Sequence, residues 1–118
     1  MTTRHPTGTI LSTLLLCSSV FFSGIASADD VSEGKQVAFD RKKGNCLACH
    51  MIPGGSLPGN IGPPLVAMKA RFPDKAALRA QIWDATAKNP NTIMPPFGKH
   101  RILSEKEVDL VTEFIHSL

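Results

Sequence analysis

Apolar residues recur at intervals of three and four between Val108 and Leu118, which is the spacing of one helix face. Ser104 and Glu107 stand three residues apart just before this pattern and can form a capping box, in which each side chain binds the other residue's backbone N–H. Leu103 can pack against Val108 as a hydrophobic staple. The pattern predicts a last helix whose apolar face packs on the first helix of the chain.

The first helix of the mature chain is predicted to run from Ser32 to Arg41. Ser32 or Asp30 can cap its start, and Val37 and Phe39 provide its apolar contacts. Residues typical of a helix end follow directly: Lys42, Lys43 and Gly44.

Helix breakers divide the middle of the chain. Glycine and proline recur from Pro53 to Pro64, so this stretch is predicted to be a loop. Apolar residues then return at helical spacing in a short segment that contains Leu65, Met68 and Phe72.

Another helix is predicted to open at Pro73-Asp74 and to carry Leu78, Ile82 and Ala85 on one face, until Asn89-Pro90 stops it. No segment alternates apolar and polar residues over a strand length. The predicted fold class is therefore all-α, with about four short helices in one small domain.

The N-terminal 28 residues have the pattern of an export signal. Arg4 precedes an apolar run from Ile10 to Ile25, and Ala26-Ser27-Ala28 places small residues where a signal peptidase cleaves. Cleavage would leave an exported domain of residues 29–118 with no stable membrane insertion. A retained anchor is the alternative, but the run is shorter and more polar than a spanning helix requires. Lipidation of Cys17 is disfavoured by the bulky Leu16 before it.

Charge and cysteine content narrow the function classes. Removal of the leader leaves 12 basic and 10 acidic residues, which argues against nucleic-acid binding. It also leaves Cys46 and Cys49 as the only thiols.

These two cysteines belong to the string Cys46-Leu47-Ala48-Cys49-His50, which is the attachment motif of c-type haem. Each thiol can form a thioether with one haem vinyl group, and the adjacent imidazole then becomes the proximal iron ligand. A zinc site and a dithiol redox motif are the alternatives. The former lacks a second ligand pair, and the latter lacks a strand and helix around it.

Met94 is the candidate for the second axial ligand. It lies in the segment Asn91–Gly98, where two prolines can hold a thioether rigidly against iron. Its competitors are weaker: Met51 is too close to His50 to reach the opposite side, Met68 has core spacing, and His100 and His116 are expected at the surface.

Pro63 is the candidate partner for the second ring nitrogen of His50. Its string Gly62-Pro63-Pro64-Leu65 resembles the Gly-Pro-x-Leu segment of class I cytochromes c, in which the proline carbonyl accepts this hydrogen bond. Alternatively, the prolines only shape the loop.

Three longer strings resemble SoxX, the monohaem cytochrome c subunit of the SoxAX complexes of sulfur oxidation. They are Gly59-Asn60-Ile61-Gly62-Pro63-Pro64-Leu65, Ile82-Trp83-Asp84-Ala85 and Asn91-Thr92-Ile93-Met94-Pro95-Pro96-Phe97-Gly98. The resemblance covers nearly all of residues 29–118. It implies a class I cytochrome c fold around one covalent haem c held by Cys46 and Cys49, with His50 and Met94 as axial ligands.

The resemblance also implies a periplasmic heterodimer with a SoxA-type cytochrome that joins thiosulfate to a carrier-protein cysteine. The SoxX-like chain would then accept electrons and pass them to a soluble cytochrome c, without being the catalytic centre of this thiosulfotransferase-type enzyme. A free-standing cytochrome c shuttle is the alternative function, and a haem sensor is a third. Two basic groups, Arg41-Lys42-Lys43 and Lys99-His100-Arg101, can steer an acidic partner or merely occupy helix ends and surface loops.

Overall fold

All regular structure in the described part of the chain is helical. The computed structural model describes residues 1–2 and 27–118, so most of the predicted leader, residues 1–28, lies outside the described residues. The elements are α1 (Ala28–Phe39), the 3-10 turn η1 (Cys46–Ala48), α2 (Met68–Arg71), α3 (Lys75–Trp83), the 3-10 turn η2 (Ala85–Ala87) and α4 (Glu105–His116). No strand occurs among these residues, which confirms the all-α prediction. Of the helices described, none has the length and apolar character needed to cross a membrane.

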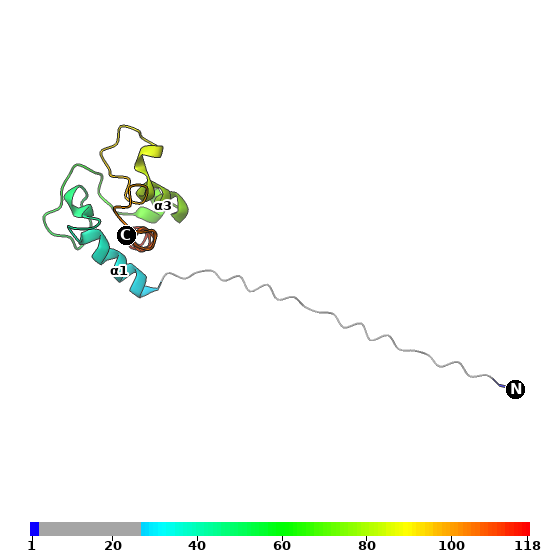
Figure 1. The fold of residues 1–118 in the computed structure, drawn as a ribbon. Coiled ribbons are helices and arrows are strands. Elements are labelled where there is room, and N and C mark those ends of the chain that lie inside the picture. The colour runs from blue at the N-terminus through cyan, green and yellow to red at the C-terminus, as the bar shows by residue number, and fades with distance from the viewer. Residues whose placement is uncertain (3–26) are drawn as a thin grey trace.

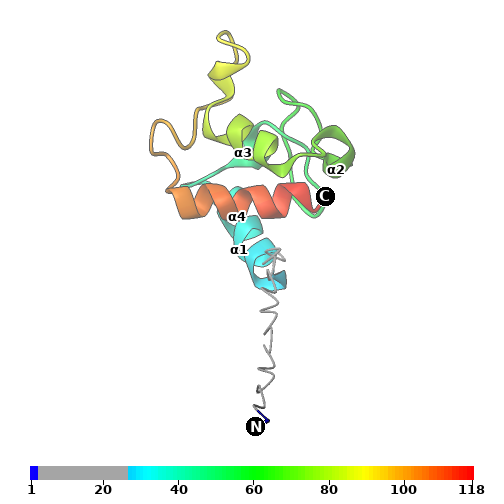
Figure 2. The same ribbon diagram turned by 90° about the vertical axis from the view of Figure 1, so that its right-hand side faces the viewer.

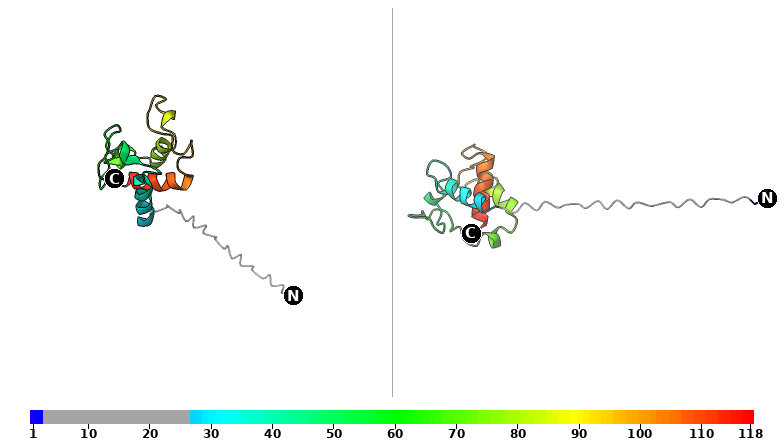
Figure 3. Two further views of the ribbon diagram at one scale, coloured as in Figure 1. Left: turned by 60° about the vertical axis from the view of Figure 1, so that its left-hand side comes forward. Right: turned by 90° about the horizontal axis from the view of Figure 1, so that it is seen from below.

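Helix α4 is the centre of the fold. It runs across the molecule with α1 on one side and α2 and α3 on the other (Figures 1 and 2), and two further views agree (Figure 3). The predicted packing of the last helix on the first is confirmed. Gly34 lets the two backbones meet, because a Cβ there would lie 2.9 Å from the Cβ of Phe114 and closer still to the Leu110 carbonyl. The rings of Phe39 and Phe114 pack edge to face, with their centroids 5.8 Å apart.

The predicted capping box opens α4. Glu107 N donates to Ser104 Oγ at 3.3 Å, and Ser104 N donates to Glu107 Oε2 at 2.9 Å. Leu103 and Val108 are both buried in the core. The helix ends at His116, so Leu118 is not on its face as predicted. The Leu118 carbonyl instead accepts a hydrogen bond from Met68 N at 2.9 Å, which ties α2 to the chain end.

The predicted start of the first helix was wrong. The helix begins at Ala28 because Ser27, not Ser32 or Asp30, is its N-cap, and Asp30 completes a capping box with Ser27. The predicted cleavage after Ala28 would therefore remove this cap.

The end of α1 also differs from the prediction. The helix stops at Phe39, before the predicted Arg41, because Asp40 is extended and its carbonyl accepts from the backbone N–H groups of Lys43 and Asn45. The left-handed residue that follows is Asn45, at φ 46°, and not Gly44.

Helices α2 and α3 are shorter than the predicted segments. Leu65 and Phe72 lie outside α2. Helix α3 begins after Pro73-Asp74 as predicted, and Asp74 caps it, with its side chain accepting from Ala76 N at 2.9 Å. The helix ends at Trp83, so Ala85 belongs to η2 and the predicted stop at Asn89-Pro90 was too late. The physical reason is tertiary, since the Trp83 carbonyl accepts from the backbone N–H groups of Gly98 and Lys99, both at 3.2 Å.

An ion pair joins the start of α4 to the segment before η1. Lys43 Nζ lies 2.6 Å from Glu107 Oε1. Hydrogen bonding to Lys43 and to the Ser104 backbone lowers the pKa of Glu107 from 4.5 to about 2. Because the folded-state pKa is depressed, the stabilisation is fully present above pH 4.5 and is lost as the pH falls from there towards about 2.

We therefore expect Glu107→Gln to flatten the acid limb of the stability curve. Glu105→Gln, in the same helical turn, is the matched control and should retain the wild-type slope. Urea unfolding of the holoprotein between pH 7 and pH 3 measures both. Equal pH slopes in the wild type and Glu107→Gln would contradict the assignment.

Candidate haem site

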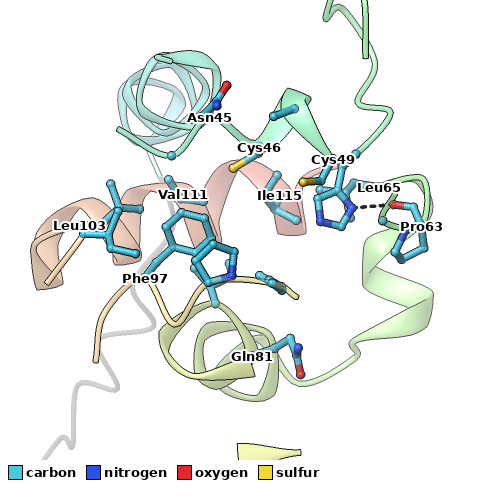
Figure 4. A pocket seen from close by; sticks show the side chains of 18 of the residues that line it. Asn45, Cys46, Cys49, Pro63, Leu65, Gln81, Phe97, Leu103, Val111 and Ile115 are labelled. Atoms are coloured by element: carbon cyan, nitrogen blue, oxygen red, sulfur yellow. Dashed lines mark hydrogen bonds between the residues drawn. The ribbon is translucent and has the colours of Figure 1, made fainter. Parts of the chain in front are cut away.

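A cavity of about 630 Å³ lies between the helices and the loops that join them (Figure 4). Its walls are mainly apolar and include Leu78 and Ile82 of α3, Val111 and Ile115 of α4, and Phe97 and Leu103 of the segment between η2 and α4. Among the described residues that line it there is no Asp or Glu, whereas Arg41, Lys42, Lys43 and Arg71 do line it. The cavity is therefore suited to a large apolar group that carries negative charge at its edge.

The haem motif forms one wall of this cavity. The turn η1 is closed by hydrogen bonds from Cys49 N at 3.2 Å and His50 N at 2.9 Å to the Cys46 carbonyl. This turn places both thiols and the imidazole along the same cavity, and Figure 4 shows the sulfur atoms of Cys46 and Cys49 directed into it. Burial raises the pKa of the Cys46 thiol to about 11.

Gly44 explains how the motif approaches α1 so closely. A Cβ at this position would lie 2.9 Å from the Val37 carbonyl oxygen and 3.3 Å from Cys46 Sγ. Gly44, which we predicted as a helix end, is therefore required for the close contact between the haem motif and α1.

The loop after the motif is hydrogen-bonded back onto it at regular intervals. Gly59 N donates to the Leu47 carbonyl at 2.8 Å, Gly62 N to the Cys49 carbonyl at 2.8 Å, and Leu65 N to the Met51 carbonyl at 2.9 Å. His50 Nδ1 lies 2.7 Å from the Pro63 carbonyl oxygen, to which it donates when protonated there. This is the contact predicted from the Gly62-Pro63-Pro64-Leu65 string, and it fixes the ring orientation.

Met94 reaches the same cavity from a different loop. Its half-buried side chain packs against the core, and its backbone N–H donates to Thr92 Oγ1 at 3.2 Å. The structure therefore brings His50 and Met94 to one cavity from separate segments.

The segment Asn91–Gly98, the methionine loop, ends beside the C-terminal end of α3. Besides the two bonds to the Trp83 carbonyl, Lys99 Nζ pairs with Asp84 Oδ2 at 2.8 Å. The bond from Lys99 lowers the pKa of Asp84. A Cβ on Gly98 would lie 2.6 Å from Trp83 Cζ3, so the glycine is needed for this closure. Sequence reasoning missed the contribution of Trp83 and Gly98, because no local pattern indicates a contact between them.

The competing ligands lie as follows. Met68 is 1% exposed and belongs to the core, as predicted, although it also lines the cavity. Met51 and His100 are exposed and do not line the cavity. The prediction that His116 is a surface residue was wrong, since it is half-buried with Nε2 3.1 Å from the Phe72 carbonyl oxygen.

The two basic groups identified in the sequence differ in their position relative to the cavity. Arg41, Lys42 and Lys43 line the cavity. Lys99, His100 and Arg101 do not, and Lys99 is paired with Asp84.

These residues fit a covalently attached haem. The cavity wall offers two free thiols and an oriented imidazole, a second loop offers a thioether sulfur, and the remaining surface is mostly apolar. Among the described residues, no group of three or more His, Cys, Asp or Glu side chains is arranged to hold a metal ion by itself.

Residues 29–115 match the protein family described as cytochrome C oxidase, cbb3-type, subunit III. The chain belongs to this family of c-type cytochromes. Its function is therefore electron transfer, and its domain is of the kind that binds haem c covalently, with Cys46 and Cys49 in the attachment motif.

The structure of this cytochrome is similar to the crystal structure of SoxXA from P. pantotrophus. The match has a TM-score of 0.66 at 28% sequence identity and covers 73% of this chain and 79% of the other. It confirms the class I cytochrome c fold and shows a SoxX-like cytochrome, as the sequence resemblance predicted.

A curated relative is an uncharacterized lipoprotein from Aquifex aeolicus (strain VF5), 33% identical over 76 residues. The aligned part is 64% of this chain but only 37% of that protein, so the cytochrome spans little more than a third of the relative's length.

We expect Gly62→Ala to disturb the haem site, because a Cβ there would lie 2.6 Å from His50 Nδ1 and 2.9 Å from Nε2. The ring must tilt away from the Pro63 carbonyl or the loop must lift. Either change should reduce the yield of haem-bearing protein or alter its reduction potential. Asn60→Ala, at an exposed position of the same loop, is the control. If Gly62→Ala had the same haem yield and reduction potential as the wild type, the close packing of residue 62 against the His50 ring would not be required.

Proposed function

We propose that this chain is the monohaem electron-transfer subunit of a SoxXA-type complex, which oxidatively conjugates thiosulfate to a carrier-protein cysteine. The similarity to the SoxXA crystal structure carries this proposal. The haem motif, the glycine-proline loop and the methionine loop support it, because all three border one cavity.

In this proposal Cys46 and Cys49 would hold one haem c through thioether bonds, and His50 and Met94 would provide the two protein ligands of its iron. A haem held by both ligands would supply one-electron transfer and would leave no coordination position open to substrate. The Pro63 carbonyl orients the imidazole at 2.7 Å. The apolar walls exclude water and keep the thioether in place. A site of this kind relays electrons and does not bind thiosulfate itself.

The electron count defines what the partners must do. Joining thiosulfate to a cysteine thiol forms one sulfur–sulfur bond, releases the thiol proton to solvent and releases two electrons. A single haem accepts one of them. The chain must therefore pass each electron to an acceptor, a soluble cytochrome c in this proposal, or share the pair with a centre on the SoxA-type subunit. We place this exchange in the periplasm, after removal of residues 1–28.

The distribution of exposed apolar residues supports a protein partner. Of the large apolar side chains that are exposed in the described residues, Met51, Leu57 and Val66 lie in segment 51–66 and do not line the cavity, so a haem bound there would not cover them. Leu57 is 91% exposed. Exposed apolar side chains of this kind are found on surfaces that another protein covers.

Co-expression with a SoxA-type cytochrome tests the proposal. We expect the two chains to co-purify, and thiosulfate to reduce the haem of this chain only when the partner and the carrier protein are present. Leu57→Asp should weaken the association, whereas Ser56→Asp, at the neighbouring exposed position, should weaken it less. An isolated chain that forms no complex would refute the subunit role.

The second candidate is a free-standing cytochrome c shuttle, which would use the same electron-transfer function of the family without a SoxA-type partner. It predicts rapid electron exchange between the isolated monomer and an oxidase, without dependence on thiosulfate or on a SoxA-type partner.

A further inference from the structure

The segment that carries the methionine loop leaves the end of α3 and returns to it. On the return, Gly98 N and Lys99 N both donate to the Trp83 carbonyl at 3.2 Å. Lys99 follows the methionine loop directly, and its Nζ lies 2.8 Å from Asp84 Oδ2. Trp83 and Asp84 on one side, with Gly98 and Lys99 on the other, therefore form a closed neck at the base of the segment.

The methionine loop has little backbone anchoring above this neck. Among the hydrogen bonds of residues 27–118, no backbone N–H of residues 93–97 donates to a residue outside the loop. Two of these residues are prolines, which have no N–H. Met94 N donates within the loop, to Thr92 Oγ1 at 3.2 Å. The position of the Met94 sulfur thus depends on the packing of Met94 and Phe97 against the core and on the neck.

Asp84 is the fixed half of the neck. Its side chain is 16% exposed, whereas that of Lys99 is 54% exposed. Asp84 Oδ1 accepts from Thr86 N at 3.1 Å and from Thr86 Oγ1, so one carboxylate oxygen caps η2 and the other binds Lys99. Of the four ion pairs among residues 27–118, this is the one that joins the two sides of the neck.

We infer that Asp84 is a positioning residue for Met94: its ion pair with Lys99 keeps the neck closed and thereby holds the thioether sulfur at the haem site. This inference rests on the proposed role of Met94 as axial ligand. Opening of the neck would release Met94 from its position and let an external ligand take its place. The ion pair therefore helps to keep the site closed to ligands other than the two protein side chains.

Variants of the full-length, haem-loaded protein test this role. Asp84→Asn keeps an oxygen acceptor for Thr86 and removes the charge. Lys99→Met removes the cation, and Lys99→Arg keeps it. Glu113→Gln is the matched control, because Glu113 pairs with Lys75 at 2.6 Å between α3 and α4 and neither of these residues lines the cavity.

Two measurements follow the neck and the ligand separately. The hydrogen-exchange rate of the Gly98 amide reports opening of the neck, whichever group binds the iron. The affinity of the oxidised protein for imidazole reports how readily Met94 gives way. In that exchange an imidazole nitrogen replaces the Met94 sulfur, and no electron is transferred.

We expect Asp84→Asn and Lys99→Met each to accelerate Gly98 exchange and to raise imidazole affinity by roughly threefold to tenfold, the scale of one partly exposed charged hydrogen bond. The double variant should exceed the single variants only slightly, because both substitutions remove the same pair. Lys99→Arg and Glu113→Gln should stay close to wild type in both measurements.

Two results would overturn the inference. Gly98 exchange in Asp84→Asn and Lys99→Met equal to that in Glu113→Gln would show that the neck does not depend on the ion pair. Faster exchange with unchanged imidazole affinity would show that the neck does not position Met94. Should Asp84→Asn not accumulate, Lys99→Met decides both points from the more exposed partner.

Failure of the proposed ligand set has a different signature. An oxidised wild-type protein without the absorption of a thioether-to-iron charge transfer would refute Met94 as a ligand, independently of Asp84.

Discussion

Met94→Ala is expected to leave the haem covalently attached while lowering its reduction potential by about 100 mV or more, within the ~0.8 V range over which axial ligands set potentials. A thioether stabilises the reduced iron relative to water or a stronger donor, so its loss favours the oxidised state. The reduced variant should also bind carbon monoxide, because a coordination position becomes open. Absorption spectra and a redox titration of the purified protein measure these changes.

Two other methionines provide controls for this experiment. Met51→Ala removes a thioether that is 47% exposed and outside the cavity, and it should change neither potential nor carbon monoxide binding. Met68→Leu replaces a buried core methionine by a residue of similar volume and should cost less than about 1.5 kcal/mol of stability. A Met94→Ala protein with the wild-type spectrum would rule out this residue as a ligand, and transfer of the effect to Met68→Leu would identify the alternative.

The second large effect is expected from Gly34→Ala at the crossing of α1 and α4. Helix propensity alone predicts that alanine stabilises α1 by about 1 kcal/mol. The tertiary contact predicts the opposite sign, because the added Cβ would lie 2.6 Å from the Leu110 carbonyl carbon and 2.9 Å from the Phe114 Cβ. The Leu110 carbonyl carbon belongs to the α4 backbone and the Phe114 Cβ is bonded to it, so neither atom can move by a change of rotamer. Helices α1 and α4 must therefore move apart. We expect a net loss of about 2 kcal/mol or more in the free energy of unfolding.

Denaturant unfolding of the holoprotein, followed by helical circular dichroism, measures this loss. Ser32→Ala, at an exposed position of the same helix, is the control and should change stability by less than about 0.5 kcal/mol. The edge-to-face contact of Phe39 with Phe114 should weaken together with the crossing. A Gly34→Ala protein as stable as wild type would show that the helix pair adjusts without cost.

Sequence reasoning was most accurate where a signal lies within a few residues. The capping box of Ser104 and Glu107 was predicted correctly because its two hydrogen bonds join residues three apart. The helix start at Pro73-Asp74 and the absence of helix between Pro53 and Pro64 were also predicted correctly, because each depends on residues within the segment itself. The candidate ligands His50 and Met94 were chosen from local motifs, and both line one cavity.

Predictions failed where a distant contact decided the outcome. Helix α3 ends at Trp83 because its carbonyl binds the backbone of Gly98 and Lys99, which follow 15 and 16 residues later in the sequence. Leu118 leaves the face of α4 and its carbonyl binds Met68 N. His116 was expected at the surface but faces the Phe72 carbonyl. None of these contacts has a signature in the neighbouring residues.

The sequence by itself determined the chemistry of this protein: a pair of thiols and an imidazole at fixed spacing, a proline-rich loop and a methionine followed by two prolines, all of which are covalent properties of the chain. Only the tertiary structure decided how these groups meet. The close crossing of α1 and α4 at Gly34 and the return of the methionine loop to Trp83 depend on packing between distant segments, which short-range propensity does not encode.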